Sequence, residues 1–220
     1  MIVLRQKPMD EILSMLEGFS SVLIVGCDGC AAVVQAGGRR QVEMMKLMLD
    51  LASKLGKLSG LRVGTASVLH QCNPEGVRST LQPLVGDYDA LLSLACGIGV
   101  QTMAMVFEDK DVIPANDTVF MGMHDWKEMK FYEYCSACGN CVLFETGGIC
   151  PITRCPKSLL NGPCGGQANG KCEVGGWVRD CAWVQIYKRL KAKGRLDLFT
   201  KFRGPRDYRA SQHPRELELR

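Results

Sequence analysis

The first 125 residues alternate short apolar runs with amphipathic segments. Residues 8–19, PMDEILSMLEGF, carry apolar side chains at helical spacing, and Pro8 suits a helix start, so we predict a helix there. The run SVLIVG at 21–26 is almost wholly apolar, which is typical of a central parallel strand covered on both faces. Residues 38–55 return to helical spacing and predict a second helix.

This order of strand and helix then recurs. LRVGTASVL (61–69) predicts a strand, and a helix follows with Asn73 as N-cap and Pro74 in its first turn. YDALLSLAC (88–96) predicts a third strand that leads into a glycine-rich turn and another helix, and DTVFMGM (117–123) predicts a fourth strand. Residues 1–130 therefore read as an α/β domain with a doubly wound, Rossmann-like parallel sheet.

The pattern changes at about residue 131. Residues 131–192 are rich in cysteine and glycine and show little periodicity until a helix predicted at 180–192. Such a segment cannot build a hydrophobic core by itself, so we predict a cysteine-rich, metal-organised C-terminal domain.

Residues 193–220 form a basic tail after the terminal helix. We expect this tail to be solvated or docked on a partner, and we expect no nucleic-acid binding, because the formal net charge is only +4.

The composition of the chain limits the class of protein and the roles that its cysteines can have. Hydrophobic residues make up 46% of the chain and charged residues 23%, as in ordinary globular proteins. No apolar run is long enough to cross a bilayer, and the N-terminus MIVLRQKPMDEIL lacks signal-peptide features, so we expect a cytoplasmic protein without a membrane span. Twelve cysteines in such a protein predict metal ligands or redox groups rather than structural disulfides.

Four cysteines follow the first three predicted strands of the α/β domain. Cys27 and Cys30 come after the first strand, Cys72 after the second, and Cys96 ends the third. Ligands of an open α/β sheet bind beyond the carboxyl ends of its strands, so these thiols are predicted to converge on a [4Fe-4S] cluster or a zinc ion. The alternative is that Cys72 and Cys96 are small buried core residues.

The other eight cysteines lie in the second domain and could form two sets of four. They are Cys135, Cys138, Cys141, Cys150, Cys155, Cys164, Cys172 and Cys181. The sequence CSACGNC has the CxxCxxC spacing that lets three thiolates bind one cubane, and Cys150 and Cys155 each precede proline, as a cysteine does in bacterial ferredoxins. The eight residues between Cys141 and Cys150 depart from the ferredoxin spacing, so sequential and interleaved sets both stay open.

Zinc is the main alternative to iron, since all-cysteine zinc sites also use CxxC pairs. The third close cysteine, the lack of histidine in the set and the abundant glycines favour iron, giving two or three [4Fe-4S] clusters with zinc open at one C-terminal site. An iron-sulfur electron carrier is thus the leading hypothesis. A zinc-organised interaction or nucleic-acid module, and a disulfide reductase built on Cys27 and Cys30, are the competing hypotheses.

The run CSACGNCVLFETGGICPITRCPKSLLNGPCGGQANGKCEV and the later DCAWVQIYKRL resemble the C-terminal domain of methylenetetrahydrofolate reductases. The resemblance is strongest to the small iron-sulfur subunit of the two-subunit enzymes of acetogenic bacteria. It implies a partner, a larger TIM-barrel flavoprotein subunit whose FMN reduces 5,10-methylenetetrahydrofolate to 5-methyltetrahydrofolate in the Wood–Ljungdahl pathway of one-carbon metabolism. By resemblance this chain relays electrons to that FMN from ferredoxin, a heterodisulfide-reductase-like complex or an NADH-oxidising subunit, and is not catalytic alone.

Overall fold

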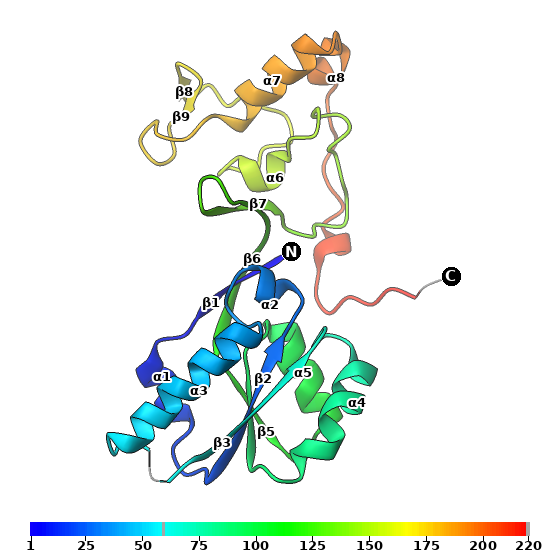
Figure 1. Cartoon of the computed structure of the whole chain (residues 1–220). Helices are drawn as coiled ribbons and strands as arrows, with labels where there is room; N and C mark the ends of the chain where they lie inside the picture. Colours follow the sequence, from blue (N-terminus) through cyan, green and yellow to red (C-terminus); the bar gives the residue numbers. More distant parts are fainter. Residues whose placement is uncertain (59, 219–220) are drawn as a thin grey trace. The chain divides into compact units, whose positions relative to one another are not determined.

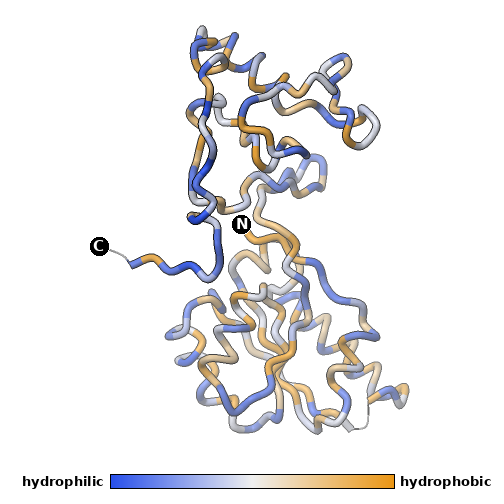
Figure 2. Tube along the Cα trace, turned by 180° about the vertical axis from the view of Figure 1, so that it is seen from behind, coloured by the Kyte–Doolittle hydropathy of each residue, from blue (hydrophilic) through white to orange (hydrophobic). Residues whose placement is uncertain are grey.

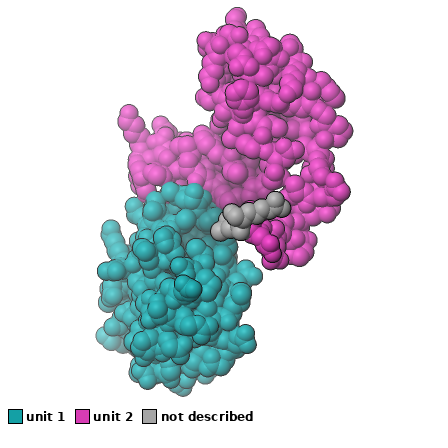
Figure 3. Space-filling model, turned by 90° about the vertical axis from the view of Figure 1, so that its right-hand side faces the viewer, with its two compact units in different colours: residues 1–120 teal, residues 121–220 magenta. Residues whose placement is uncertain are grey.

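The computed structural model describes residues 1–58 and 60–218 and divides into two compact units, residues 1–120 and 121–220 (Figure 3). Residue 59 of the predicted first domain and residues 219 and 220 of the predicted tail lie outside the described residues. Within the described part of the chain, no helix is both long and apolar enough to cross a membrane.

A four-stranded parallel sheet forms the centre of the first unit. Its strands are β2 (Ser21–Cys27), β3 (Arg62–Val68), β4 (Ala90–Ser93) and β5 (Asp111–Pro114), in the order β3-β2-β4-β5. Every neighbouring pair is parallel, so all four strands end at the same edge. The apolar run of β2 is buried along its whole length, as its sequence predicts. Figure 2 shows these strands as the most hydrophobic part of this unit.

Helices cover both faces of this sheet (Figure 1). They are α1 (Met9–Met15), the short α2 (Cys30–Val33), α3 (Arg39–Lys54), α4 (Pro74–Val85) and α5 (Gly97–Val106). Buried side chains of α1 and α3 pack against Val22 and Ile24 of β2, whereas those of α4 and α5 pack against Leu23 and Val25. Alternate residues of one strand thus enter two separate cores, which confirms a mixed α/β fold with a buried parallel sheet.

The start of α4 follows the capping rule that the sequence suggests. The Asn73 side-chain oxygen accepts hydrogen bonds from the backbone N–H groups of Glu75, at 3.0 Å, and Gly76, at 3.2 Å. Pro74 occupies the first turn, where no intrahelical N–H donor is needed. The cap fixes the turn between β3 and α4 in which Cys72 lies.

The fourth strand of the parallel sheet differs from the prediction. Residues 117–123 are extended, but they belong to β6 (Asn116–Asp125), which lies in another sheet of order β1-β6-β7 with β1 (Ile2–Gln6) and β7 (Lys130–Cys135). The parallel sheet instead takes β5, a segment of four residues that ends in proline. The strand propensity of a segment does not depend on which sheet it joins, so it cannot predict the strands with which the segment pairs. β6 begins in the first unit and ends in the second.

The second unit has little regular structure. It contains α6 (Pro151–Arg154), the hairpin strands β8 (Gln167–Ala168) and β9 (Lys171–Cys172), α7 (Ala182–Ala192), α8 (Leu196–Thr200) and a 3₁₀ turn, η1 (Tyr208–Ser211). The predicted helix at 180–192 is α7. Its residues Trp183, Ile186 and Leu190 pack on Ile149 and Cys155 in a small core. This core joins α6, the loop before it and α7.

Close backbone packing beside β2 generates the first prediction. The carbonyl of Gly37 accepts a hydrogen bond from Cys27 N at 2.8 Å, and a Cβ atom on Gly37 would lie 1.7 Å from the carbonyl oxygen of Leu94. Replacing Gly37 with alanine should lower the free energy of unfolding of the chain by roughly 3 kcal/mol, because backbone must move. Chemical denaturation measures this loss. Gly86→Ala is the matched control, since its Cβ would meet no atom within 4 Å, and it should change stability by about 0.5 kcal/mol or less. Equal effects of the two variants would refute the argument.

Candidate metal centres

The structure places the first four cysteines at one edge of the parallel sheet. Cys27 is the last residue of β2, Cys30 begins α2, Cys72 lies in the turn between β3 and α4, and Cys96 is the N-cap of α5. Strands β3, β2 and β4 are neighbours, and Cys27 pairs in register with Val68, the last residue of β3. All four residues therefore follow the carboxyl ends of adjacent strands, where α/β sheets bind their ligands.

A buried glutamine ties these strand ends together. Gln71 is 0% exposed, and its side-chain amide donates hydrogen bonds to the carbonyls of Val25 at 2.8 Å and Gly26 at 2.9 Å. Its side-chain oxygen accepts a hydrogen bond from the buried hydroxyl of Ser93 at 2.7 Å. Gln71 precedes Cys72, Gly26 precedes Cys27, and Ser93 is the last residue of the strand before Cys96, so one side chain links the chain segments that carry these cysteines.

The exposure of the thiols tests whether Cys72 and Cys96 are small buried core residues. Cys27 is buried, Cys30 and Cys96 are half-buried, and Cys72 is exposed. Because neither Cys72 nor Cys96 is buried, the hypothesis that they are small core residues is wrong. Within the described residues, no three cysteine, histidine, aspartate or glutamate side chains are arranged so that they could hold one metal ion as they stand.

Four cysteines of the second unit line one cavity. Cys135 at the end of β7, Cys138 and Cys141 in the loop after it, and Cys150, the N-cap of α6, surround a volume of about 200 Å³ together with Arg206. This volume is several times the roughly 30 Å³ that a water molecule occupies in the liquid. The residue Cys150, which the sequence left unassigned, thus groups with the CxxCxxC motif.

The loop that carries the CxxCxxC motif turns back on itself. Ala137 and Gly139 have φ angles of 50° and 77°, in the left-handed region that is typical of tight turns. The backbone N–H of Ala137 donates to the sulfur of Cys135 at 3.4 Å. A Cβ atom on Gly139 would lie 2.7 Å from the carbonyl of Ala210, so only glycine fits between the loop and the C-terminal part of the chain.

Arg206 is the functional residue that the sequence analysis missed in this cavity. One guanidinium nitrogen donates to the carbonyl of Cys138 at 3.3 Å, while Nη1 is buried and has no hydrogen-bond partner among the described residues. Burial would raise the pKa of the Cys138 thiol, but hydrogen bonding to the backbone at Asn140 and the hydrogen bond and charge of Arg206 outweigh it, so that pKa is lowered. A lowered pKa favours the thiolate, the form that binds metal. A half-buried cation whose Nη1 is a spare donor also suits an anionic group inside the cavity.

The remaining cysteines surround the β8–β9 hairpin and the start of α7. Cys155 follows α6, Cys172 ends β9 and Cys181 is the N-cap of α7, while Cys164 lies in the loop before the hairpin. Cys155 and Cys181 belong to the small core around Trp183. The Cys164 sulfur lies 3.9 Å from the carboxylate of Glu173, the residue after Cys172, and 3.6 Å from Lys157 Nζ. Cys155 and Cys181 thus share a core, and Cys164 lies near the residue that follows Cys172.

Comparison with known proteins gives a match over the cysteine-rich part of the chain. Residues 113–209 match a family model described as methylene-tetrahydrofolate reductase C terminal. Residues 113–209 are therefore similar to that family, and we call them the reductase C-terminal region. No curated protein and no solved structure gives a significant match. The matched range contains all eight C-terminal cysteines and also Arg203 and Arg206, so the basic residues after α7 are part of the reductase C-terminal region.

A buried arginine holds the end of the reductase C-terminal region against its cysteine-rich part. Arg203 forms an ion pair with Glu145, with Nε 2.9 Å from Oε2, and also donates to the backbone carbonyls of Glu145, Leu198 and Leu160. The Asn161 side chain makes two hydrogen bonds with the Arg203 backbone, at 2.9 and 2.8 Å. The predicted basic tail therefore folds back on its own unit through Arg203 and Arg206. Composition alone could not reveal this, because the same residues suit a solvated tail.

The Gln71 network leads to the second prediction. Gln71→Ala removes the buried partners of Gly26 O and Ser93 Oγ and leaves a cavity, so the free energy of unfolding should fall by roughly 3 kcal/mol. Gln101→Ala is the matched control, because its amide donates to Gly97 O at 3.0 Å on an exposed surface, and it should cost about 0.5 kcal/mol or less. Urea titration of both variants measures the difference. Similar small losses would show that Gln71 does not hold the strand ends together.

The third prediction concerns acid stability. The hydrogen bond with Lys201 and the charges of Lys201 and Arg203 outweigh burial and hold the pKa of Glu145 below its usual range. Its stabilising contribution is therefore complete above the ordinary glutamate pKa of about 4.3 and is lost as pH falls through the lowered folded-state value. Glu145→Gln should cost roughly 1–2 kcal/mol at pH 7, and the difference from the unchanged protein should shrink below about pH 4.

Urea denaturation at several pH values tests this expectation, followed by a signal from the second unit such as tryptophan fluorescence. Glu128→Gln, which removes an exposed ion pair with Lys130, is the control and should have little effect at any pH. A cost of Glu145→Gln that does not change with pH would contradict the assigned role of the carboxylate.

Proposed function

We propose that this chain is the iron-sulfur electron-transfer subunit of a methylenetetrahydrofolate reductase complex. It passes electrons to the FMN of a larger TIM-barrel subunit, which reduces 5,10-methylenetetrahydrofolate to 5-methyltetrahydrofolate. The family match of residues 113–209 supports the association with a reductase. The observation that carries the proposal is the cavity that Cys135, Cys138, Cys141 and Cys150 share with Arg206.

The assignment of ligands follows the spatial groups. Cys135, Cys138, Cys141 and Cys150 hold one [4Fe-4S] cluster, and the strand-end set Cys27, Cys30, Cys72 and Cys96 holds another. A cubane bound by four thiolates is anionic in its usual oxidation states, so a cationic neighbour stabilises it. Arg206, whose Nη1 lacks a partner among the described residues, supplies that charge in the second unit.

A [4Fe-4S] cluster supplies one-electron transfer when bound. The chain's own residues orient the thiolates and set their environment. The N–H of Ala137 donates to the Cys135 sulfur, and hydrogen bonds to cluster sulfurs are one way in which proteins tune reduction potential. The flavin and folate chemistry belongs to the partner subunit, and the electrons come from ferredoxin, a heterodisulfide-reductase-like complex or an NADH-oxidising subunit.

The last group, Cys155, Cys164, Cys172 and Cys181, has a structural role in this proposal. Two of its members lie in the core beside Trp183, where ligation would join α6, the hairpin and α7. A core of this size gains most from such a cross-link, as in other small metal-organised domains. Iron and zinc both suit four thiolates, and metal analysis decides between them.

The fourth prediction tests the proposal by metal content. The full chain, purified without oxygen, should be brown, contain iron and acid-labile sulfide, and give an electron paramagnetic resonance signal after reduction. Cys141→Ser and Cys72→Ser should each remove about four irons per chain, from different clusters. Ser136→Ala, a neighbour within the same loop, should keep the full iron content.

The reduced protein should also be reoxidised by added FMN under anaerobic conditions, as an electron donor to flavin requires. A colourless protein that contains only zinc, or an iron content unchanged in Cys141→Ser, would contradict the proposal. Iron that is present but cannot be reduced and reoxidised would exclude the electron-transfer role.

A further inference from the structure

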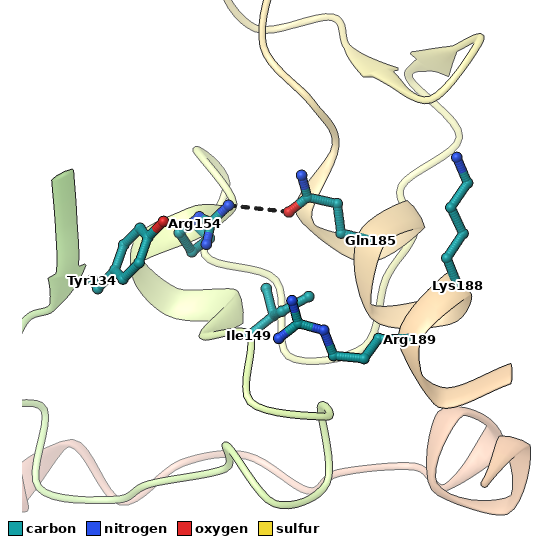
Figure 4. Close-up of a pocket in the computed structure, with 6 residues that line it drawn as sticks. All are labelled: Tyr134, Ile149, Arg154, Gln185, Lys188 and Arg189. Carbon is teal, nitrogen blue, oxygen red and sulfur yellow. Dashed lines mark hydrogen bonds between the residues drawn. The ribbon is translucent and has the colours of Figure 1, made fainter. Parts of the chain in front are cut away.

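A basic cavity lies beside α6 and α7, outside the cysteine-lined cavity. Its volume is about 490 Å³, and it is lined by Tyr134, Ile149, Arg154, Gln185, Lys188 and Arg189 (Figure 4). Three of these six residues are cationic and none is acidic. The cavity is a wide, open hollow on the surface of the second unit.

The two arginines are held in place by contacts that leave most of their donors available. The Arg154 guanidinium carbon lies 4.6 Å from the ring centroid of Tyr134, and Nη2 donates to Gln185 Oε1 at 3.0 Å. Arg189 Nη1 donates to the carbonyl of Gly147 at 3.3 Å. Figure 4 shows Arg154 pointing from α6 toward Gln185, and Arg189 reaching from α7 toward Ile149. Each guanidinium has five N–H donors, and these hydrogen bonds use one of each.

One acidic residue, Asp180, contacts the wall of the cavity, and its charge interacts with Lys188 as well as with Lys171. Asp180 accepts a hydrogen bond from Gln185 Nε2 at 3.2 Å, but it forms an ion pair with Lys171 at 2.6 Å. Gln185 therefore contacts Asp180 with its amide nitrogen and Arg154 with its oxygen. No ion pair joins Arg154 or Arg189 to an acidic side chain among the described residues.

We propose that this cavity binds a small ligand that carries two or more oxyanion groups, either phosphates or carboxylates. Guanidinium groups bind both kinds of group in a bidentate fashion, and two such groups from different helices suit a ligand with two anionic centres. Tyr134 and Ile149 directly precede Cys135 and Cys150, so the ligand lies next to the first cysteine group of the second unit. The inference does not rest on the proposed function.

The fifth prediction is tested by isothermal titration calorimetry of the full chain, purified without oxygen, with pyrophosphate and separately with a tri-glutamate peptide. At least one of them should bind saturably at one site per chain, more weakly at higher salt. The ligand that binds identifies the source of the oxyanion groups. Arg154→Gln and Arg189→Gln should each weaken binding about tenfold. Arg154→Lys should restore only part of the loss, because lysine keeps the positive charge but lacks the paired N–H donors that bind an oxyanion in a bidentate fashion.

Lys193→Gln is the matched control, since it removes one positive charge just after α7 without lining the cavity, and it should leave affinity within about twofold. Lys188→Gln, at an exposed position of the wall, should weaken binding about threefold and guards against misfolding of the arginine variants. Circular dichroism checks that each variant is folded. No saturable binding of either probe at millimolar concentration, or equal weakening by Lys193→Gln and Arg189→Gln, would overturn the proposal.

Discussion

Parallel pairing of β3, β2 and β4 is the constraint on which the first unit depends. Because all three strands end at one edge, residues that are far apart in the sequence, such as Cys27, Cys72 and Cys96, must follow neighbouring strand ends. The same geometry leaves polar backbone groups at that edge, and Gln71 satisfies them with a fully buried side chain. The strand ends are thus fixed by hydrogen bonds from within, while the cysteines beyond them stay at least partly accessible, apart from Cys27. A rigid edge with accessible thiols is what a preorganised metal site requires.

The second unit holds the loops that carry its cysteines in place without a large sheet. Among the residues that the structure describes, a small apolar core lies around α7. Instead, two arginines from the C-terminal part of the chain bind the cysteine-rich loops: Arg203 pairs with Glu145, and Arg206 donates to Cys138 O inside the cysteine-lined cavity. Close packing of Gly139 against Ala210 adds a steric limit at the same place. The cysteine-rich loops and the basic segment therefore form one folded unit. Ligation of a metal by the thiolates would add further cross-links to those that the arginine hydrogen bonds make.

The sequence predicted the features that have a local signal. The burial of β2, the Asn73 cap of α4 and the positions of β2, β3 and β4 along the chain follow from residue periodicity and capping chemistry. Pairing could not be predicted in the same way, since residues 117–123 look like a strand whichever sheet they join, and β5 has only four residues. The grouping of Cys150 with the CxxCxxC motif, and the role of Arg206, depend on how the chain folds back over many residues. A basic segment has the same composition whether it is solvated or packed, so its arginines carried no signal of the contacts they make.

We propose that the cysteines form separate metal sites according to their place in the fold, with iron at the strand-end set and at the CxxCxxC set. Diffraction from crystals of the anaerobically purified chain, recorded on both sides of the iron absorption edge, tests this claim most directly. The account predicts anomalous iron density between Cys27, Cys30, Cys72 and Cys96, and again in the cavity shared by Cys135, Cys138, Cys141, Cys150 and Arg206. Iron density absent from both places, with zinc density or disulfide bonds joining these cysteines instead, would contradict it.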